Sequence, residues 1–265
     1  MFNKHDTFDR HYEVILADNI AGRTLHYRIR YLVYCVELGF EDPDRFPEGL
    51  EQDHWDEQSV HFLVRTRATG EWIAAMRLVL PHEGKLPVEH LCQLNTDALP
   101  PVAPSQLGEI SRLCVIDHVR HQAPSTGAST DPLKDIADVA PAPGARHESK
   151  IILGLLRAAS AFSRLHGIKY WYFITTPALA RRISRLNMLL KPIGAVVQHR
   201  GDRYPYLADL EESERRASAI SADIVAMLAV DVTYRLYSEV CGSAMNLPSQ
   251  DGYLSIPVVV HAVVK

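Results

Sequence analysis

The chain has 265 residues, 47% of them hydrophobic and 23% charged, so it can bury the core of one large domain. No apolar run approaches the roughly 20 residues that span a bilayer. The first residues lack the apolar core of a signal peptide, so we expect a cytoplasmic protein with no integral membrane segment. The four cysteines have no paired spacing, so we expect neither a disulfide framework nor a metal site.

The net charge of −4 is unevenly distributed along the chain. Residues 146–203 hold 11 Lys and Arg against 2 Asp and Glu, whereas residues 1–145 hold 13 against 22. A basic middle in an acidic chain indicates a surface for an acidic partner, or else ordinary solvated helix faces. We expect no nucleic-acid partner.

The N-terminal half alternates between strand, helix and loop signals. Apolar residues recur at helical spacing after a capping residue, and Pro, Gly and acidic residues mark the loop. The predicted elements are a strand over 11–17, a helix from Asp18 or Asn19 to about Leu38, a loop over 40–58, and a hairpin of strands over 60–68 and 71–81.

The C-terminal half predicts a parallel strand pair, because strand, helix, strand and helix patterns follow one another from 108 to 190. We expect one large domain over 1–210 and a packed helical extension over 211–265. The predicted elements are a proline-rich connection over 81–107, a strand over 108–116, a mobile insertion over 118–148, a helix capped by Ser149 and ended by Gly167, a strand over 168–175, a helix from Thr176 to about Leu190, one or two strands within 193–208, a long helix over 211–240 and a strand-like run over 256–264.

The strand over 108–116 carries polar residues where a core strand would carry valines. Alternation puts Glu109 and Ser111 on one face and Arg112 on the other. Ionised groups at buried positions require partners. We expect these partners to be Arg30, Asp53, Asp56 and Arg77.

Such a cluster has two interpretations. It could be a buried ion network that only joins the N-terminal loop to the sheet. Alternatively, a carboxylate could take a proton from an amine while an arginine binds a substrate carboxylate, which is the chemistry needed to acylate an amino compound. Residue spacing leaves both interpretations open.

Four motifs in the same order resemble those of acyl-homoserine-lactone synthases, a branch of the GCN5-related N-acyltransferase superfamily. The family's first motif is Arg-x3-Phe-x5-Trp, and this chain has other aromatic residues at its last two positions. The matching positions are Arg30, Tyr34 and Phe40; Glu51, Asp53 and Asp56 for Glu-x-Asp-x2-Asp; Arg77 for the strand arginine; and 109–112 (EISR) for Glu-Leu-Ser-Arg.

Segments 34–41, 47–64 and 77–81 more closely resemble the exosortase (PEP-CTERM) system-associated acyltransferases, which are related to N-acyl amino acid synthases. This resemblance implies an α/β (α+β) GCN5-related fold with a central mixed, twisted sheet flanked by helices. It also implies a fatty acyl donor on the phosphopantetheine of acyl carrier protein, an amino acid or similar amine as acceptor, and no tightly bound cofactor. The lactone-synthase branch implies S-adenosylmethionine as acceptor instead, and a third alternative is a non-catalytic protein that binds carrier protein or acyl chains.

The resemblance assigns roles residue by residue. Catalytic roles fall to Glu109, as the group that orients or deprotonates the amine, and to Arg77 and Arg112, which would hold a substrate carboxylate or brace the loop acids. The substrate-binding candidates are Arg30, Tyr34, Phe40, Asp53, Asp56 and Ser111. A carrier protein presents its prosthetic group on an acidic surface, so the docking candidates in the basic segment are Arg157, Arg164, Arg181, Arg182 and Arg185.

Overall fold

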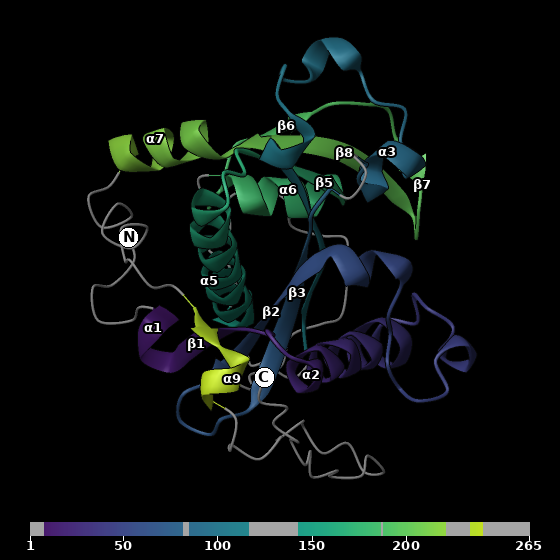
Figure 1. Cartoon of the computed structure of the whole chain (residues 1–265), viewed down its shortest axis with the longest axis vertical. Helices are drawn as coiled ribbons and strands as arrows, with labels where there is room; N and C mark the ends of the chain where they lie inside the picture. The colour runs from purple at the N-terminus through teal and green to yellow at the C-terminus, as the bar shows by residue number, and fades with distance from the viewer. Residues whose placement is uncertain (1–7, 82–84, 117–142, 187, 221–233, 241–265) are drawn as a thin grey trace, which may run out of the picture.

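The computed structural model describes residues 8–81, 85–116, 143–186, 188–220 and 234–240. They form a nine-stranded mixed sheet with helices on both faces (Figure 1). The strand order is β6-β8-β5-β4-β3-β2-β1-β9, and β7 pairs with β8. The strands are β1 (Tyr12–Leu16), β2 (Ser59–Thr66), β3 (Trp72–Val79), β4 (Leu107–Val115), β5 (Tyr170–Thr175), β6 (Leu190–Pro192), β7 (Val197–Gln198), β8 (Asp202–Asp209) and β9 (Arg235–Leu236).

The helices connect these strands in the predicted order. None of the described helices combines the length and apolar character needed to span a bilayer. The helical segments are α1 (Phe8–His11), α2 (Ile20–Tyr31), the π-helix η1 (Leu32–Glu37), the 3-10 turns η2 (Pro43–Arg45), η3 (His54–Gln58), η4 (Thr96–Ala98) and η5 (Pro104–Gln106), and the α-helices α3 (Pro87–Leu91), α5 (Pro143–Leu165), α6 (Pro177–Ser184), α7 (Leu210–Ile220) and α9 (Tyr237–Val240).

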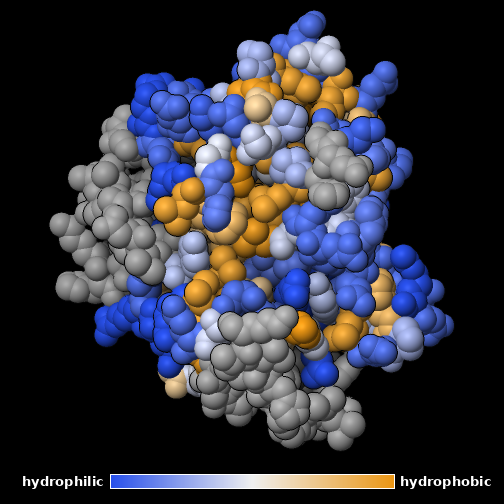
Figure 2. All heavy atoms as spheres, in the orientation of Figure 1, coloured by the Kyte–Doolittle hydropathy of each residue, from blue (hydrophilic) through white to orange (hydrophobic). Residues whose placement is uncertain are grey.

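The two faces of the sheet carry separate cores, as strand alternation requires. Val14 and Phe62 pack beneath α5, whereas their neighbours Ile15 and Leu63 pack beneath α2. Figure 1 shows α5 running across the sheet, and Figure 2 shows an apolar strip at the middle of this side, bordered by hydrophilic side chains. The polar network described below lies on the α2 face.

Strands β4 and β5 pair in parallel over only part of their length. Their register joins Leu107–Ile110 to Tyr170–Phe173, and α5 supplies the crossover connection. The predicted parallel pair is therefore confirmed. Because the register ends at Ile110, the second half of β4 is not paired with β5, and the polar residues lie close to this point.

A β-bulge interrupts β4 directly after the paired segment. Ala75 faces Cys114 and Arg77 faces Ser111, so Met76 of β3 lies opposite two residues of β4. Arg112 is one of them and has φ +52, in the left-handed region. The extra residue resets the alternation, which decides where the arginine side chain lies.

The N-terminal elements agree with the sequence predictions. Asn19 caps α2 by accepting a hydrogen bond from the Gly22 amide, and the π-helix η1 continues the helical path to Glu37. The strands over 11–17, 60–68 and 71–81 correspond to β1, β2 and β3. The predicted loop over 40–58 contains two short 3-10 turns, of which η3 orients two acids of the site.

Three boundaries in the C-terminal half were predicted wrongly. Helix α5 begins at Pro143, ahead of the predicted cap Ser149, and α6 ends at Ser184, short of Leu190. The predicted helix over 211–240 is not continuous, because Arg235–Leu236 form a strand parallel to β1. Residues 118–142 of the predicted insertion and the run over 256–264 lie outside the described residues.

Candidate active site

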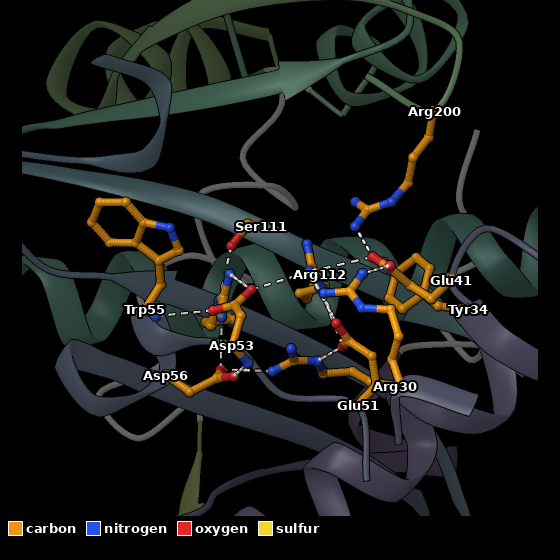
Figure 3. A network of polar contacts seen from close by, with 12 residues as sticks. Arg30, Tyr34, Glu41, Glu51, Asp53, Trp55, Asp56, Ser111, Arg112 and Arg200 are labelled. Carbon is orange, nitrogen blue, oxygen red and sulfur yellow. Dashed lines mark hydrogen bonds and ion pairs between the residues drawn. The ribbon is translucent and has the colours of Figure 1, made fainter. Parts of the chain in front are cut away.

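The carboxylate of Asp56 is the centre of a buried polar network (Figure 3). Its Oδ1 accepts hydrogen bonds from Arg30 Nη1 at 2.6 Å, Arg77 Nη1 at 2.8 Å and His61 Nε2 at 3.1 Å. Its Oδ2 accepts from the Asp53 amide at 2.7 Å. These four donors come from a helix, two strands and a loop, so one carboxylate holds four segments together.

The 3-10 turn η3 presents Asp53 and Asp56 as a capping box. Asp53 is the N-cap, and its Oδ1 accepts from the Trp55 amide at 3.0 Å while Asp56 binds the Asp53 amide in return. Local hydrogen bonding within the turn thus orients both acids. The capping box requires acids at positions i and i+3, which is the spacing of Asp53 and Asp56.

Arg77 uses its whole guanidinium inside the network. Nη1 and Nη2 donate to the two carboxylate oxygens of Asp53 at 2.6 and 3.2 Å, Nη1 also reaches Asp56, and Nε donates to Ser111 Oγ at 3.1 Å. Among the two roles expected for Arg77, the geometry favours bracing of the loop acids. Ser111 supports the arginine, since its hydroxyl accepts this bond.

Arg112 lies on the same side of the sheet as Ser111, contrary to the alternation predicted from sequence. Its Nε and Nη2 donate to Glu51, and Nη2 also donates to Asp53 at 3.0 Å. The bulge at Arg112 is the physical reason, because one inserted residue turns the side chain to the face of its predecessor. Leu113 then packs on the α5 face instead.

The inner part of the network is sealed from water. Arg30, Glu51, Asp56 and Arg77 are each at most 4% exposed, whereas Asp53 is 24% exposed and Arg112 14%. Arg30 donates to Glu51 through Nε, but its Nη2 has no hydrogen-bond partner in the described part of the chain. The interior is therefore structural, and the edge at Asp53 and Arg112 faces outward.

The arginines keep the network acids ionised. Burial opposes ionisation of Glu51, but Arg30 and Arg112 hold its pKa below the ordinary value. Burial also opposes ionisation of Asp56, and the His61 hydrogen bond together with Arg30 and Arg77 holds its pKa far below the ordinary value. The pKa of Asp53 is lowered against its own burial by Arg77.

Two buried histidines extend the network on the β3 side. The His26 and His61 rings meet edge to face with centroids 4.7 Å apart, and His26 Nε2 lies 3.2 Å from the Met76 carbonyl oxygen. Burial and the neighbouring histidine hold the pKa of His26 well below its ordinary value, and burial also lowers the pKa of His61. Both rings are neutral at physiological pH, so they add no further cation.

Glu109 has an environment opposite to that of the network acids. Its carboxyl is 2% exposed, has no ion-pair partner among the described residues, and accepts a hydrogen bond from the Val88 amide at 2.7 Å. Burial raises the pKa of Glu109 to about 8, and the Val88 hydrogen bond and Arg77 offset this only in part. The strand therefore carries one carboxyl that is poised to exchange a proton near neutral pH.

The aromatic candidates are separated by the structure. The Tyr34 hydroxyl donates to the Leu113 carbonyl oxygen at 3.1 Å, and its ring lies below Arg112, with 5.7 Å between guanidinium carbon and centroid. Phe40 is 43% exposed, and its substrate-binding role stays a prediction. Burial raises the pKa of Tyr34, so its hydroxyl stays protonated.

The docking candidates are not equivalent. Arg157 is buried and holds both carboxylate oxygens of Asp9, so it is withdrawn from the predicted docking surface. Arg164 pairs with Glu214 at 2.5 Å, and Arg182 pairs with Glu148 at 2.8 Å. The exposed candidates that pair with no acidic side chain among the described residues are Arg181 and Arg185, four residues apart at the end of α6.

Sequence reasoning missed three partners and understated a fourth. Glu51 was recognised only as a motif position, yet it binds both Arg30 and Arg112. His61 alternates with apolar residues on β2 and faces Arg77, which was a usable signal. Glu41 and Arg200 contact each other from distant segments, and no local pattern indicates that pair. No group of three potential metal ligands is found among the described residues.

Comparison with known proteins agrees with this architecture. Residues 29–127 match the family described as acetyltransferase (GNAT) domain. Comparison with curated protein sequences gives no match.

Three solved structures share the fold at low identity, and two of them, BjaI and LasI, are described as acyl-homoserine lactone (AHL) synthases. TofI in complex with an inhibitor and MTA is 19% identical, with 83% of this chain and 97% of that chain covered and a TM-score of 0.52. BjaI, a CoA-dependent synthase solved with SAM and isopentyl-CoA, is 16% identical, with coverages of 85% and 92% and a TM-score of 0.55. LasI is 15% identical, with coverages of 76% and 90% and a TM-score of 0.50. The chain has a GNAT-like fold, as predicted.

Loss of Arg30 should cost far more stability than loss of a surface arginine. We expect Arg30→Met to lower the free energy of unfolding by about 3–5 kcal/mol, because it removes one of the two arginines that pair with each of two buried carboxylates, Glu51 and Asp56. Arg45→Met is the control: Arg45 is 66% exposed and pairs with Glu41, and we expect a cost of about 1 kcal/mol or less. Urea denaturation measures both, and equal costs would contradict the buried network.

The stability of the protein should report the raised pKa of Glu109. The folded carboxyl keeps its proton up to about pH 8, whereas the unfolded carboxyl loses it near its ordinary pKa of 4.5. The contribution of Glu109 protonation to the free energy of unfolding is therefore complete below pH 4.5, and it is lost as the pH rises to 8. The Gln side chain does not titrate. We therefore expect the free energy of unfolding of Glu109→Gln minus that of the wild type to increase by about 1.4 kcal/mol per pH unit in that window. Denaturation between pH 5 and 9 measures it, and a pH-independent difference would exclude the shift.

Proposed function

We propose that the protein is an N-acyltransferase that moves a fatty acyl group from the thioester of a carrier to the amine of an amino acid or similar compound. The observation that carries the proposal is the contrast on one sheet face between ionised network acids and Glu109, whose pKa is about 8. Carboxyl groups whose pKa values are driven apart mark acid–base assignments. The GNAT-like fold and the acetyltransferase domain match support acyl transfer as the reaction class.

In the proposed reaction, Glu109 accepts a proton from the acceptor ammonium. The freed amine nitrogen attacks the thioester carbonyl carbon, the C–N bond forms, and the carbonyl oxygen becomes an oxyanion. Collapse of this intermediate breaks the C–S bond, the attacking nitrogen gives its second proton to the departing thiolate, and Glu109 passes the proton that it took from the ammonium to solvent. Arg77 and Asp53 act as positioning residues, because their bonds fix the loop and strand around this site.

Acyl carrier protein is the proposed donor, and the exosortase-associated branch remains a prediction. The exposed Arg181 and Arg185 support acyl carrier protein as the donor, because they offer positive charge that no acidic side chain in the described part of the chain neutralises. BjaI is described as CoA-dependent, so acyl-CoA is tested in parallel. A lactone synthase that uses S-adenosylmethionine and a non-catalytic acyl-binding protein are the alternatives.

The reaction is tested by product mass. The purified protein is incubated with acyl carrier protein or acyl-CoA, together with a pool of amino acids or with S-adenosylmethionine, and products are read by mass spectrometry. We expect N-acyl amino acids, with kcat/KM rising about tenfold per pH unit and levelling near pH 8 because Glu109 must lose its proton. In Glu109→Gln we expect a loss of about 10²-fold or more and no such rise. An acyl-homoserine lactone product would identify a lactone synthase. Binding of the acyl carrier by the protein without formation of a product would identify a non-catalytic acyl-binding protein.

Charge reversal tests the carrier surface. We expect Arg181→Glu with Arg185→Glu to slow association with acyl carrier protein at least about tenfold at low salt, and less at high salt because ions screen the attraction. The control is Arg23→Glu with Arg28→Glu on α2, which makes the same change of charge away from α6. Stopped-flow binding over a salt series measures both, and equal rates for the two variants would exclude this surface.

A further inference from the structure

A carboxylate of the chain itself lies between two arginines that come from different parts of the sheet. Glu41 Oε1 contacts Arg200 Nη2 and lies 3.8 Å from Arg112 Nη2. Arg112 belongs to β4, and Arg200 belongs to the turn between β7 and β8. Figure 3 shows Arg200 reaching across toward Glu41 beside Arg112.

Arg200 is less completely paired than the arginines of the sealed network. Its Nη2 contacts Glu41, its Nη1 lies 3.0 Å from His199 Nε2, and its side chain is 23% exposed. In contrast, all three guanidinium nitrogens of Arg77 donate hydrogen bonds, to Ser111 and to the two aspartates. Arg200 thus retains hydrogen-bonding capacity at the outward edge of the site.

Glu41 has a second partner that lies nearer to solvent. Arg45, one turn later, donates from Nη1 to Glu41 Oε2 at 3.2 Å and is 66% exposed. The residues before Glu41 are exposed as well, with Leu38 at 38% and Phe40 at 43%. If Glu41 leaves Arg200, it therefore keeps Arg45 as a cationic partner. Replacing Glu41 at Arg200 by another carboxylate then costs little free energy.

We propose that Arg200 and Arg112 bind the carboxylate of the acceptor, and that Glu41 occupies this position until the acceptor displaces it. The inference rests on the proposed function and narrows its acceptor to amines that carry a carboxylate. An exchange of carboxylates leaves the charge between the two arginines unchanged, whereas simple addition would bury an extra anion. Two guanidiniums also suit the two oxygens of a carboxylate.

Opposite effects of two variants test this exchange. We expect Arg200→Gln to raise KM for an amino acid about tenfold or more, because a charge-assisted bond is lost. We expect Glu41→Gln to lower the same KM about threefold or more, because the internal competitor loses its charge. KM for the corresponding amino acid amide should stay unchanged in both variants. The control Arg203→Gln removes a charge from the same hairpin, and Arg203 contacts the Asp202 carbonyl oxygen instead.

A merely structural ion pair predicts a different pattern. If Glu41 and Arg200 only fastened two segments, both variants would change KM in the same direction and act equally on acid and amide, which would overturn the proposal. Thermal-shift titration of the wild type with amino acid and amide gives a readout without turnover. If the wild type binds the amino acid but not the amide, and Arg200→Gln binds neither, the carboxylate site is supported even if no acyl product forms. Acyl transfer without discrimination between acid and amide overturns this inference and leaves the proposed function intact.

Discussion

The electrostatic requirement of Asp56 determines how the N-terminal segments are arranged. A buried carboxylate is tolerated only when donors surround it, and here the donors come from α2, β2, β3 and the loop before η3. Placing Arg30 and Arg77 around this group also fixes the places of Glu51 and Asp53. The loop over 40–58 is thereby bound to the sheet without a large apolar core of its own.

This arrangement explains how one sheet face can hold carboxyl groups of opposite character. The network acids receive arginines and stay ionised, whereas Glu109, two residues before Ser111 on the same strand, receives one backbone amide and stays near its titration point. The braced network gives Glu109 a rigid neighbourhood.

Much of the fold was readable from local sequence, because hydrophobic period and capping residues specify short-range structure. Asn19 and Thr176 cap the helices that were expected there, and the parallel β4–β5 pair follows from the order of elements. The face of Arg112 was not readable, because a bulge depends on how two strands pair. Arg200 was equally hidden, since its partner Glu41 is remote in sequence. The burial of Arg157, which excludes it as a docking residue, likewise depends on tertiary packing and was not readable from local sequence.

The short strand β9 has a consequence for solubility. β1 would otherwise be the outermost strand, with backbone donors and acceptors free to pair with another molecule. Arg235 and Leu236 cover Ile15 and Leu16 on that border, and Tyr237 stacks on Trp72 with ring centroids 5.9 Å apart to anchor the cover. The C-terminal segment thus covers part of this border, so shortening the chain ahead of Arg235 would expose Ile15 and Leu16 to intermolecular β-pairing and promote aggregation while leaving β4 untouched.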